Sequence, residues 1–215
     1  MARKEVSEKT LEINICAELL GQIRGWPGCH HATWIGMKQD QEFRNGLDGL
    51  VRNAPGFHMM LQFKSPSPTP RDTFPYRFRI GGHQYRALRR LSNLHPHAVH
   101  YVFPLFNTLR ALGGACPHLL GGTHFLPVSV LPKGLRGYHR VECDRRSIAV
   151  YSKPFKPDFT SWEGLMGQFS QHDFRKAMMP SGVLHEWIDE VKKEYSARQV
   201  GQMFRGMATV FVGQP

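Results

Sequence analysis

The segment that most constrains the fold is FHMMLQFK, residues 57–64, which lies between two proline-containing turns. A short, largely apolar run with such flanks is typical of a strand that is buried on both faces. On an extended strand Gln62 and Lys64 share one face, whereas Leu61 and Phe63 share the other. Burying polar side chains without partners is costly, so Gln62 and Lys64 require either a function or a hydrogen-bond network.

The segments around this strand predict alternating helices and strands. In order, we expect a helix over 7–24, a strand hairpin over 33–51, the strand over 57–64, a loop over 65–75, a helix from Gly82 to Leu94 and a strand over 98–106. Ser7 is a suitable N-cap for the first helix, and Gly25 ends it. The favoured two-residue turn Asn45-Gly46 places the tip of the hairpin.

The second half of the chain predicts a strand over 125–131, a hairpin over 138–151 and a helix over 184–204. We therefore expect an α/β (α+β) fold with a central mixed sheet flanked by helices, and a C-terminal hairpin and helix extension. A length of 215 residues suits a single domain, 1–215. Within it, residues 7–106 form the expected core and residues 107–215 an extension packed on that core.

The balance of charge indicates an anionic partner. The sequence has 28 Lys and Arg against 17 Asp and Glu, a formal net charge of +11. Nucleic acid is the first expectation and an acidic membrane surface the second. No apolar run approaches the length of a membrane-spanning helix, and the N-terminus leads into no signal-peptide core. The sequence also has no basic amphipathic helix or lipid-anchor motif, so we expect a cytoplasmic protein without a membrane partner.

Clusters of basic residues could supply phosphate contacts, and aromatic residues are interleaved with some of them. The candidate nucleic-acid-binding residues are Arg86, Arg89, Arg90, Arg145 and Arg146. Each cluster has an alternative interpretation as an ordinary solvated face.

Three polar residues are candidates for chemistry: Asp48 after the hairpin turn, then Gln62 and Lys64 at the end of the next strand. In the first helix, Glu12 falls within the apolar stripe, where a carboxylate needs a cation, a metal or hydrogen bonds. Glu18 falls at the edge of that stripe and is the alternative. Asp48 could instead be a turn residue, and Gln62 and Lys64 could lie on the solvated face of an edge strand.

The cysteines do not indicate zinc or disulfides. Cys16, Cys29, Cys116 and Cys143 have no C-x-x-C spacing, and we expect reduced thiols.

Together, Glu12, Asp48, Gln62 and Lys64 resemble the PD-(D/E)xK nuclease superfamily, which has the restriction-endonuclease-like fold. The resemblance covers about residues 7–106 and includes the order helix, hairpin, strand, helix, strand. Gln62 stands where most members have an acidic residue, which makes this a Q-x-K variant. Gln84 resembles the glutamine that many members carry in the following helix, near the active site.

The resemblance implies hydrolysis of phosphodiester bonds in DNA that depends on Mg²⁺ or Mn²⁺. It implies a metal held by Asp48 with Glu12 and Gln62, and a Lys64 that orients water or stabilises charge on the phosphate. It also implies a bacterial defence, restriction or mobile-element setting. The alternatives are a non-catalytic nucleic-acid-binding subunit of the same fold and an RNA-directed nuclease; a homodimer or a subunit of a larger complex is also left open.

Overall fold

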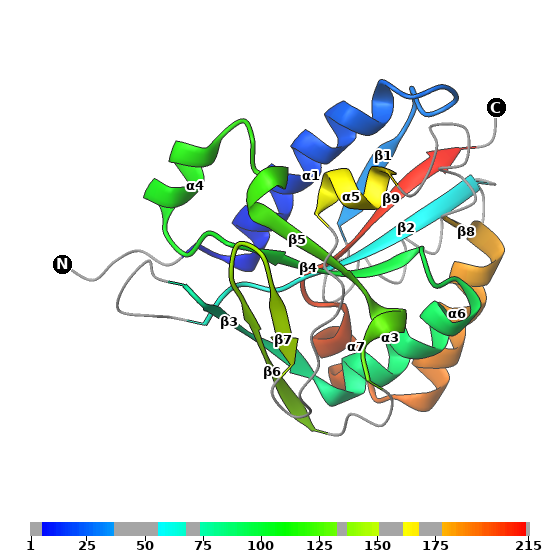
Figure 1. Ribbon diagram of the computed structural model, residues 1–215. Helices are drawn as coiled ribbons and strands as arrows, with labels where there is room; N and C mark the ends of the chain where they lie inside the picture. Colours follow the sequence, from blue (N-terminus) through cyan, green and yellow to red (C-terminus); the bar gives the residue numbers. More distant parts are fainter. Residues whose placement is uncertain are drawn as a thin grey trace.

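A computed structural model of the chain describes residues 6–36, 56–67, 74–132, 137–150, 161–167 and 178–213 (Figure 1). The helices are α1 (Glu8–Arg24), α3 (Gly82–Leu94), α4 (Leu109–Ala115), α5 (Trp162–Gly167), α6 (Ser181–Glu194) and α7 (Ala197–Phe204), with 3-10 turns η2 (Leu120–Gly122) and η3 (Val128–Val130). The strands are β1 (Thr33–Gly36), β2 (Gly56–Phe63), β3 (Tyr76–Gly81), β4 (Val99–Pro104), β5 (Thr123–Pro127), β6 (Tyr138–Cys143), β7 (Ile148–Val150), β8 (Met179–Pro180) and β9 (Met207–Gly213). Within these ranges, none of the helices has both the length and the apolar composition needed to cross a bilayer.

The main sheet of the described residues is mixed, in the order β1-β9-β2-β4-β5, and β8 also pairs with β2. β2 and β4 are parallel, as expected of two strands joined through a helix, whereas β9 is antiparallel to both β1 and β2. The predicted α+β class with a central mixed sheet is therefore confirmed. β5 and β9, from the part of the chain after residue 106, belong to the same sheet as β2 and β4.

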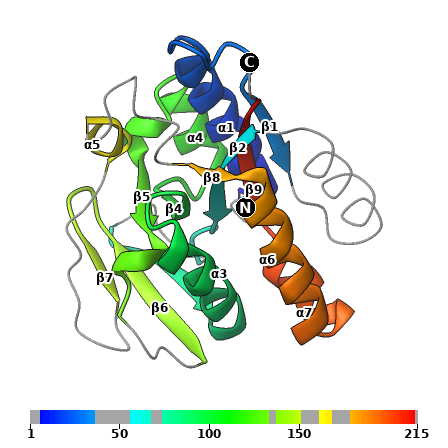
Figure 2. The same ribbon diagram turned by 90° about the vertical axis from the view of Figure 1, so that its right-hand side faces the viewer.

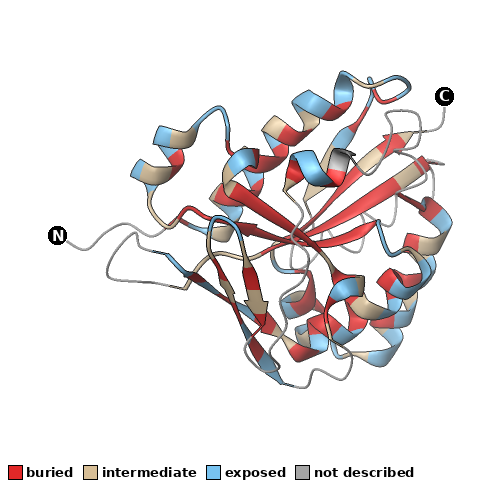
Figure 3. Cartoon of the chain, viewed as in Figure 1, coloured by how far each residue is buried: buried red, intermediate tan, exposed pale blue. Residues whose placement is uncertain are grey.

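Helices cover both faces of this sheet (Figures 1 and 2). Because side chains alternate along β2, Met59 and Leu61 belong to the apolar cluster of α1, whereas Met60 belongs to that of α3, α6 and α7. The strands between the two layers are almost entirely buried (Figure 3). As a consequence, Gln62, which has the parity of Met60, lies on the α3 side of the sheet and faces away from α1.

The helix ends follow local signals in the sequence. The Ser7 side chain accepts a hydrogen bond from the Thr10 N–H, and Gly25 closes α1, as predicted. The helix expected over 184–204 is instead two helices, α6 and α7. They are separated at Ser196, whose side chain and that of Gln199 form a capping box that begins α7.

A smaller sheet in the order β3-β6-β7 lies beside the main one (Figure 1). The predicted hairpin is present as β6 and β7, with Asp144 at its turn. It is not a separate appendage, because β6 pairs along its length with β3 from the first half of the chain. β3 leads directly into α3, so this sheet and α3 together border the end of β2.

Candidate functional site

A pocket of about 630 Å³ opens where β2 ends. Its wall is built from the residue after β2, the end of β3, the first turn of α3, the start of β6, and α7 with the segment that follows it. Four lining side chains are cationic, namely Lys64, Arg79, Arg86 and Arg205, and no carboxylate occurs among the described lining residues. The pocket therefore has the charge of an anion-binding site.

The first turn of α3 adds to this positive character. Gly81 is the N-cap and offers no side-chain hydrogen bond, and the first turn contains no acidic residue. The first N–H groups of a helix have no partner within the helix, and the helix dipole makes this end positive. Gly82, His83 and Gln84 line the pocket, so this helix start borders the same cavity as the four cations.

Lys64 is the cation at the inner wall. Its backbone N–H donates to Val102 O at 3.0 Å, which extends the parallel ladder between β2 and β4 by one residue and fixes the position of Lys64. Burial lowers the pKa of the Lys64 amine to about 8, with a smaller contribution in the same direction from Arg205, while the carboxylate of Glu8 acts against both. Lys64 therefore exchanges its proton close to neutral pH.

Glu8, in the first turn of α1, is the carboxylate whose charge acts on Lys64. Burial raises the pKa of Glu8, whereas Lys64, Arg205 and a 3.3 Å hydrogen bond from the Ser65 N–H lower it. Its side chain packs against Gly206, where a Cβ atom would overlap the carboxylate. Sequence reasoning missed Glu8, because an acidic residue in the first turn of a helix is explained by the helix dipole alone.

Glu12 is buried, with 2% of its side chain exposed, and its Oε1 accepts a 2.8 Å salt bridge from Lys9. Burial raises the pKa of Glu12, Lys9 lowers it, and the charge of Glu8 raises it further. The prediction that Glu12 needs a charged partner is met by Lys9. The alternative, Glu18, has a different role: its Oε2 accepts hydrogen bonds from the backbone N–H groups of Leu119 and Leu120.

Gln62 and Gln84 are brought together, but as partners of each other. Gln84 Nε2 donates to Gln62 Oε1 at 2.7 Å and to Met203 O at 2.5 Å. Gln62 Nε2 donates to Phe63 O at 3.0 Å and to Arg205 O at 2.8 Å. The three carbonyls only accept hydrogen bonds, so the orientation of both amides is fixed and all four amide hydrogens are used.

Of the three expected metal ligands, Glu12, Asp48 and Gln62, the structure describes Glu12 and Gln62, and it does not bring these two together. Asp48 lies outside the described residues. Glu12 is on α1 and Gln62 is on the opposite side of the sheet, where its Oε1 accepts a hydrogen bond from Gln84. Among the residues that the structure describes, no group of three His, Cys, Asp or Glu could hold a metal ion. Carboxylates of the kind that Mg²⁺ prefers are present in Glu8 and Glu12, one turn apart.

The arginines predicted to bind nucleic acid make different contacts in the structure. Arg86 lines the pocket, with its guanidinium 3.0 Å from His83 Nδ1. Arg89 does not reach the pocket, because it donates to the carbonyls of Val128, Ser129 and Leu131 and ties α3 to η3.

The remaining three predicted arginines lie away from the pocket lining. Arg90 forms a two-pronged ion pair with Glu194 of α6. Arg145 stacks over the Phe74 ring at 5.3 Å, and the Arg146 N–H donates to Asp144 in the turn of the hairpin. The sequence did not single out Arg79 or Arg205, although the alternation of charged and apolar residues in YRFRIG was a usable signal for the exposure of Arg79.

Comparisons of the chain with protein-family models, with curated proteins and with solved structures gave no match.

Proposed function

We propose that the protein binds the phosphate backbone of nucleic acid, DNA in the first instance, in the pocket at the end of β2 and hydrolyses a phosphodiester bond beside Lys64. The observation that carries this proposal is the composition of the pocket: four cations and an uncapped helix start, with no described carboxylate in the lining. Phosphate is the anion that such a combination of guanidinium groups, an ammonium group and backbone N–H groups suits best.

In this proposal Lys64 is the catalytic residue. Protonated, it stabilises negative charge that develops on the phosphate oxygens, in a site that is partly shielded from water. A pKa of about 8 also lets Lys64 pass a proton to or from the reacting oxygen near neutral pH. Arg86 and Arg205 bind the phosphates on either side of the scissile one. The carboxylate of Glu8 favours the protonated form of Lys64.

The proposed cofactor, Mg²⁺ or Mn²⁺, rests on the family resemblance. Glu12, with Glu8 and Asp48, would supply its carboxylate ligands, and Glu8 and Glu12 lie outside the pocket lining. The repulsion that Glu8 exerts on Glu12, which contributes to the raised pKa of Glu12, is what a divalent cation would relieve. Such a metal would polarise the scissile phosphate and lower the pKa of an attacking water. Binding requires Lys9 to release Glu12.

A second candidate is nucleic-acid binding without cleavage. It is favoured by one observation: Gln62, at the position of the family's usual acidic residue, has both amide hydrogens and its oxygen engaged in hydrogen bonds. The cytoplasmic bacterial defence, restriction or mobile-element setting, RNA as the substrate, and assembly with a second copy or a partner subunit remain proposals that rest on the family resemblance.

Incubation with plasmid DNA, single-stranded DNA and RNA in Mg²⁺, Mn²⁺ or EDTA separates the two candidates. A nuclease cuts at least one of these substrates only with metal, and loses cleavage in Lys64→Ala and Asp48→Ala but not in Lys193→Ala, a control on the exposed side of α6. Binding in EDTA with no cleavage in any metal supports the second candidate. Absence of both binding and cleavage contradicts both candidates.

A further inference from the structure

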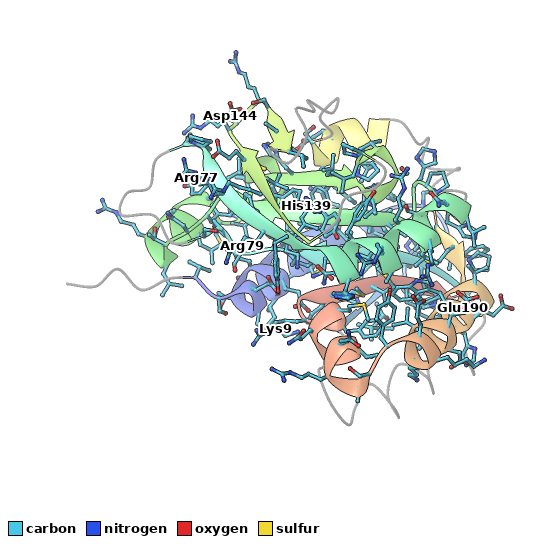
Figure 4. All side chains as sticks on the ribbon, turned by 90° about the horizontal axis from the view of Figure 1, so that it is seen from below. Lys9, Arg77, Arg79, His139, Asp144 and Glu190 are labelled. Atoms are coloured by element: carbon cyan, nitrogen blue, oxygen red, sulfur yellow. The ribbon has the colours of Figure 1, made fainter. Side chains whose placement is uncertain are left out.

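The exposed face of the smaller sheet continues the rim of the pocket. Along β3, the exposed residues Arg77 and Arg79 alternate with the buried residues Tyr76, Phe78 and Ile80, and Figure 4 shows both arginines on this strand. On β6, Tyr138 and Arg140 are exposed while His139 is buried. Exposed residues of the two strands therefore form one surface, whose order is set by the β3–β6 register.

Charge changes abruptly along this surface. Arg77 faces Glu142 across the strands, and their side chains form an ion pair of 2.8 Å. In the next pair on the same face, Arg79 lies opposite Arg140. Two like charges directly opposite each other on an antiparallel pair are unfavourable in the free protein. An anion lying between these two arginines would remove that repulsion.

The following pair on this face is Gly81 opposite Tyr138. The Tyr138 side chain is 80% exposed, the largest exposed fraction among the large apolar and aromatic residues that the structure describes. It borders the pocket, and the guanidinium of Arg79 lies 5.9 Å from the centre of its ring. An aromatic ring that is left in water buries little apolar area in the free protein, and its exposed surface suits a stacking partner.

We propose that this surface, made of Arg79, Tyr138 and Arg140, binds a single-stranded segment of nucleic acid, with one base stacked on Tyr138 and the adjacent phosphates at Arg79 and Arg140. The proposal rests on the proposed function, because the strand then continues into the pocket beside Lys64. A base in a duplex has both faces covered by its neighbours, so stacking on Tyr138 requires an unpaired or extruded base.

The size and lining of the pocket agree with this substrate class. Pockets of about 300–1,000 Å³ hold ligands the size of a single nucleotide, and a volume of about 630 Å³ lies in this range. The amide of Gln202, which lines the pocket from α7, can donate to and accept from base edges, and the amide nitrogen of Gln199 can donate while its oxygen stays in the capping box. Duplex DNA could reach the arginines but could not place a base in this cavity.

The test is the affinity for a fluorescein-labelled oligothymidylate and for a labelled, blunt-ended DNA hairpin closed by a non-nucleotide linker, so that all its bases are paired; both are measured by anisotropy in EDTA so that no cleavage occurs. We expect Tyr138→Ala to weaken binding of the single strand by roughly 5- to 150-fold and binding of the hairpin by less than about 2-fold. Tyr138→Phe keeps the ring and should bind as the wild type does. Leu94→Ala is the control, because Leu94 is also exposed but lies at the far end of α3.

Salt dependence tests the phosphate contacts. Arg140→Gln should reduce the slope of log affinity against log salt by about 0.7 for the single strand, whereas Arg77→Gln, on the same face but paired with Glu142, should leave the slope unchanged. The inference is overturned if Tyr138→Ala binds the single strand as the wild type does, or if it weakens the single strand and the hairpin equally. Binding that follows these expectations in a protein that never cleaves would reject only the proposed catalysis.

Discussion

Gln84 Nε2 donates a 2.7 Å hydrogen bond to Gln62 Oε1, so the two glutamines nearest to the end of β2 are each other's partners. Through Arg205 O and Met203 O the same amides also fasten the end of α7 to β2 and α3. Both side chains are buried. Their role in this structure is to hold the wall of the pocket in place, with Lys64 presented next to it.

Replacing Gln62 by Glu should therefore destabilise the protein and not improve metal binding. A carboxylate at this position would face the carbonyls of Phe63 and Arg205, which have no hydrogen to donate. The loss of two hydrogen bonds and the burial of a charge should lower the free energy of unfolding by about 2–5 kcal/mol at neutral pH. Urea denaturation measures this difference.

Gln202→Glu is the matched control for this substitution, because Gln202 is exposed on α7 and should tolerate the change within about 0.5 kcal/mol. A Gln62→Glu protein as stable as the wild type, with tighter Mg²⁺ binding, would contradict the structural role of Gln62 and would favour its role as a metal ligand.

Lys64→Met should increase the stability of the protein at neutral pH. Burial lowers the pKa of Lys64 from 10.5 in the unfolded chain to about 8, so the folded state binds this proton less tightly. Wild-type stability should therefore rise as the pH increases from about 8 to 10.5, where the unfolded state holds more protons. We expect the free energy of unfolding of Lys64→Met to exceed that of the wild type by roughly 2 kcal/mol at pH 7. This difference should shrink as the pH rises from about 8 to 10.5.

Thermal or urea unfolding at several pH values measures this difference, with Lys193→Met as an exposed control. Since Glu8 loses an attractive charge in Lys64→Met, the comparison is repeated in a Glu8→Gln background. If the difference in free energy of unfolding between Lys64→Met and the wild type stays constant from pH 7 to alkaline pH, the pKa of Lys64 is not lowered in the folded protein.

Gly206→Ala should destabilise the protein for two separate reasons. Gly206 has φ +66°, which is unfavourable for alanine, and its Cβ would overlap the Glu8 carboxylate. Gly137→Ala is the control, because Gly137 has φ +75° but open space around its Cβ position. We expect Gly206→Ala to cost at least about 1 kcal/mol more than Gly137→Ala in urea denaturation.

Truncating Glu8 distinguishes the two contributions. In a Glu8→Ala background the overlap is gone, so the two glycine substitutions should cost the same within about 0.5 kcal/mol. If the excess cost of Gly206→Ala persists in that background, Glu8 does not occupy the space beside Gly206.

The three arginines of α3 should respond differently to alanine substitution. Arg86→Ala should weaken nucleic-acid binding with little change in stability, because Arg86 is exposed and lines the pocket. Arg89→Ala should lower the free energy of unfolding by about 1.5–3 kcal/mol, because it removes three charge-assisted hydrogen bonds to backbone carbonyls. Arg90→Ala removes an exposed ion pair and should cost less than about 1 kcal/mol. Anisotropy and urea denaturation of the three variants check this division, and similar losses of affinity in all three would contradict it.

Local signals predicted much of the fold. Ser7 and Gly25 mark the ends of α1, the apolar run around Met60 forms β2, and Asp144 lies in the turn of the β6–β7 hairpin. Each of these features depends on residues close together in the sequence. The break between α6 and α7 was also readable, since Ser196 and Gln199 have the spacing of a capping box.

The remaining features depend on contacts between distant parts of the chain. β9 enters the sheet between β1 and β2, a pairing that no local pattern of residues 207–213 indicates. Gln62 could be recognised as a polar residue on a buried strand, but its partner Arg205 O lies at the other end of the sequence. The pocket likewise combines Lys64, Arg79 and Arg205, which sequence spacing does not connect.

The central claim is that Lys64 acts on a phosphodiester bond of nucleic acid bound in this pocket. Its most direct test is the single-turnover rate of cleavage in Mg²⁺ or Mn²⁺ at saturating nucleic acid, for the wild type, Lys64→Ala and the control Lys193→Ala. We predict that Lys64→Ala lowers this rate at least about 100-fold, with a much smaller effect on affinity, while Lys193→Ala cleaves as the wild type does. Cleavage by Lys64→Ala at the wild-type rate would contradict the account.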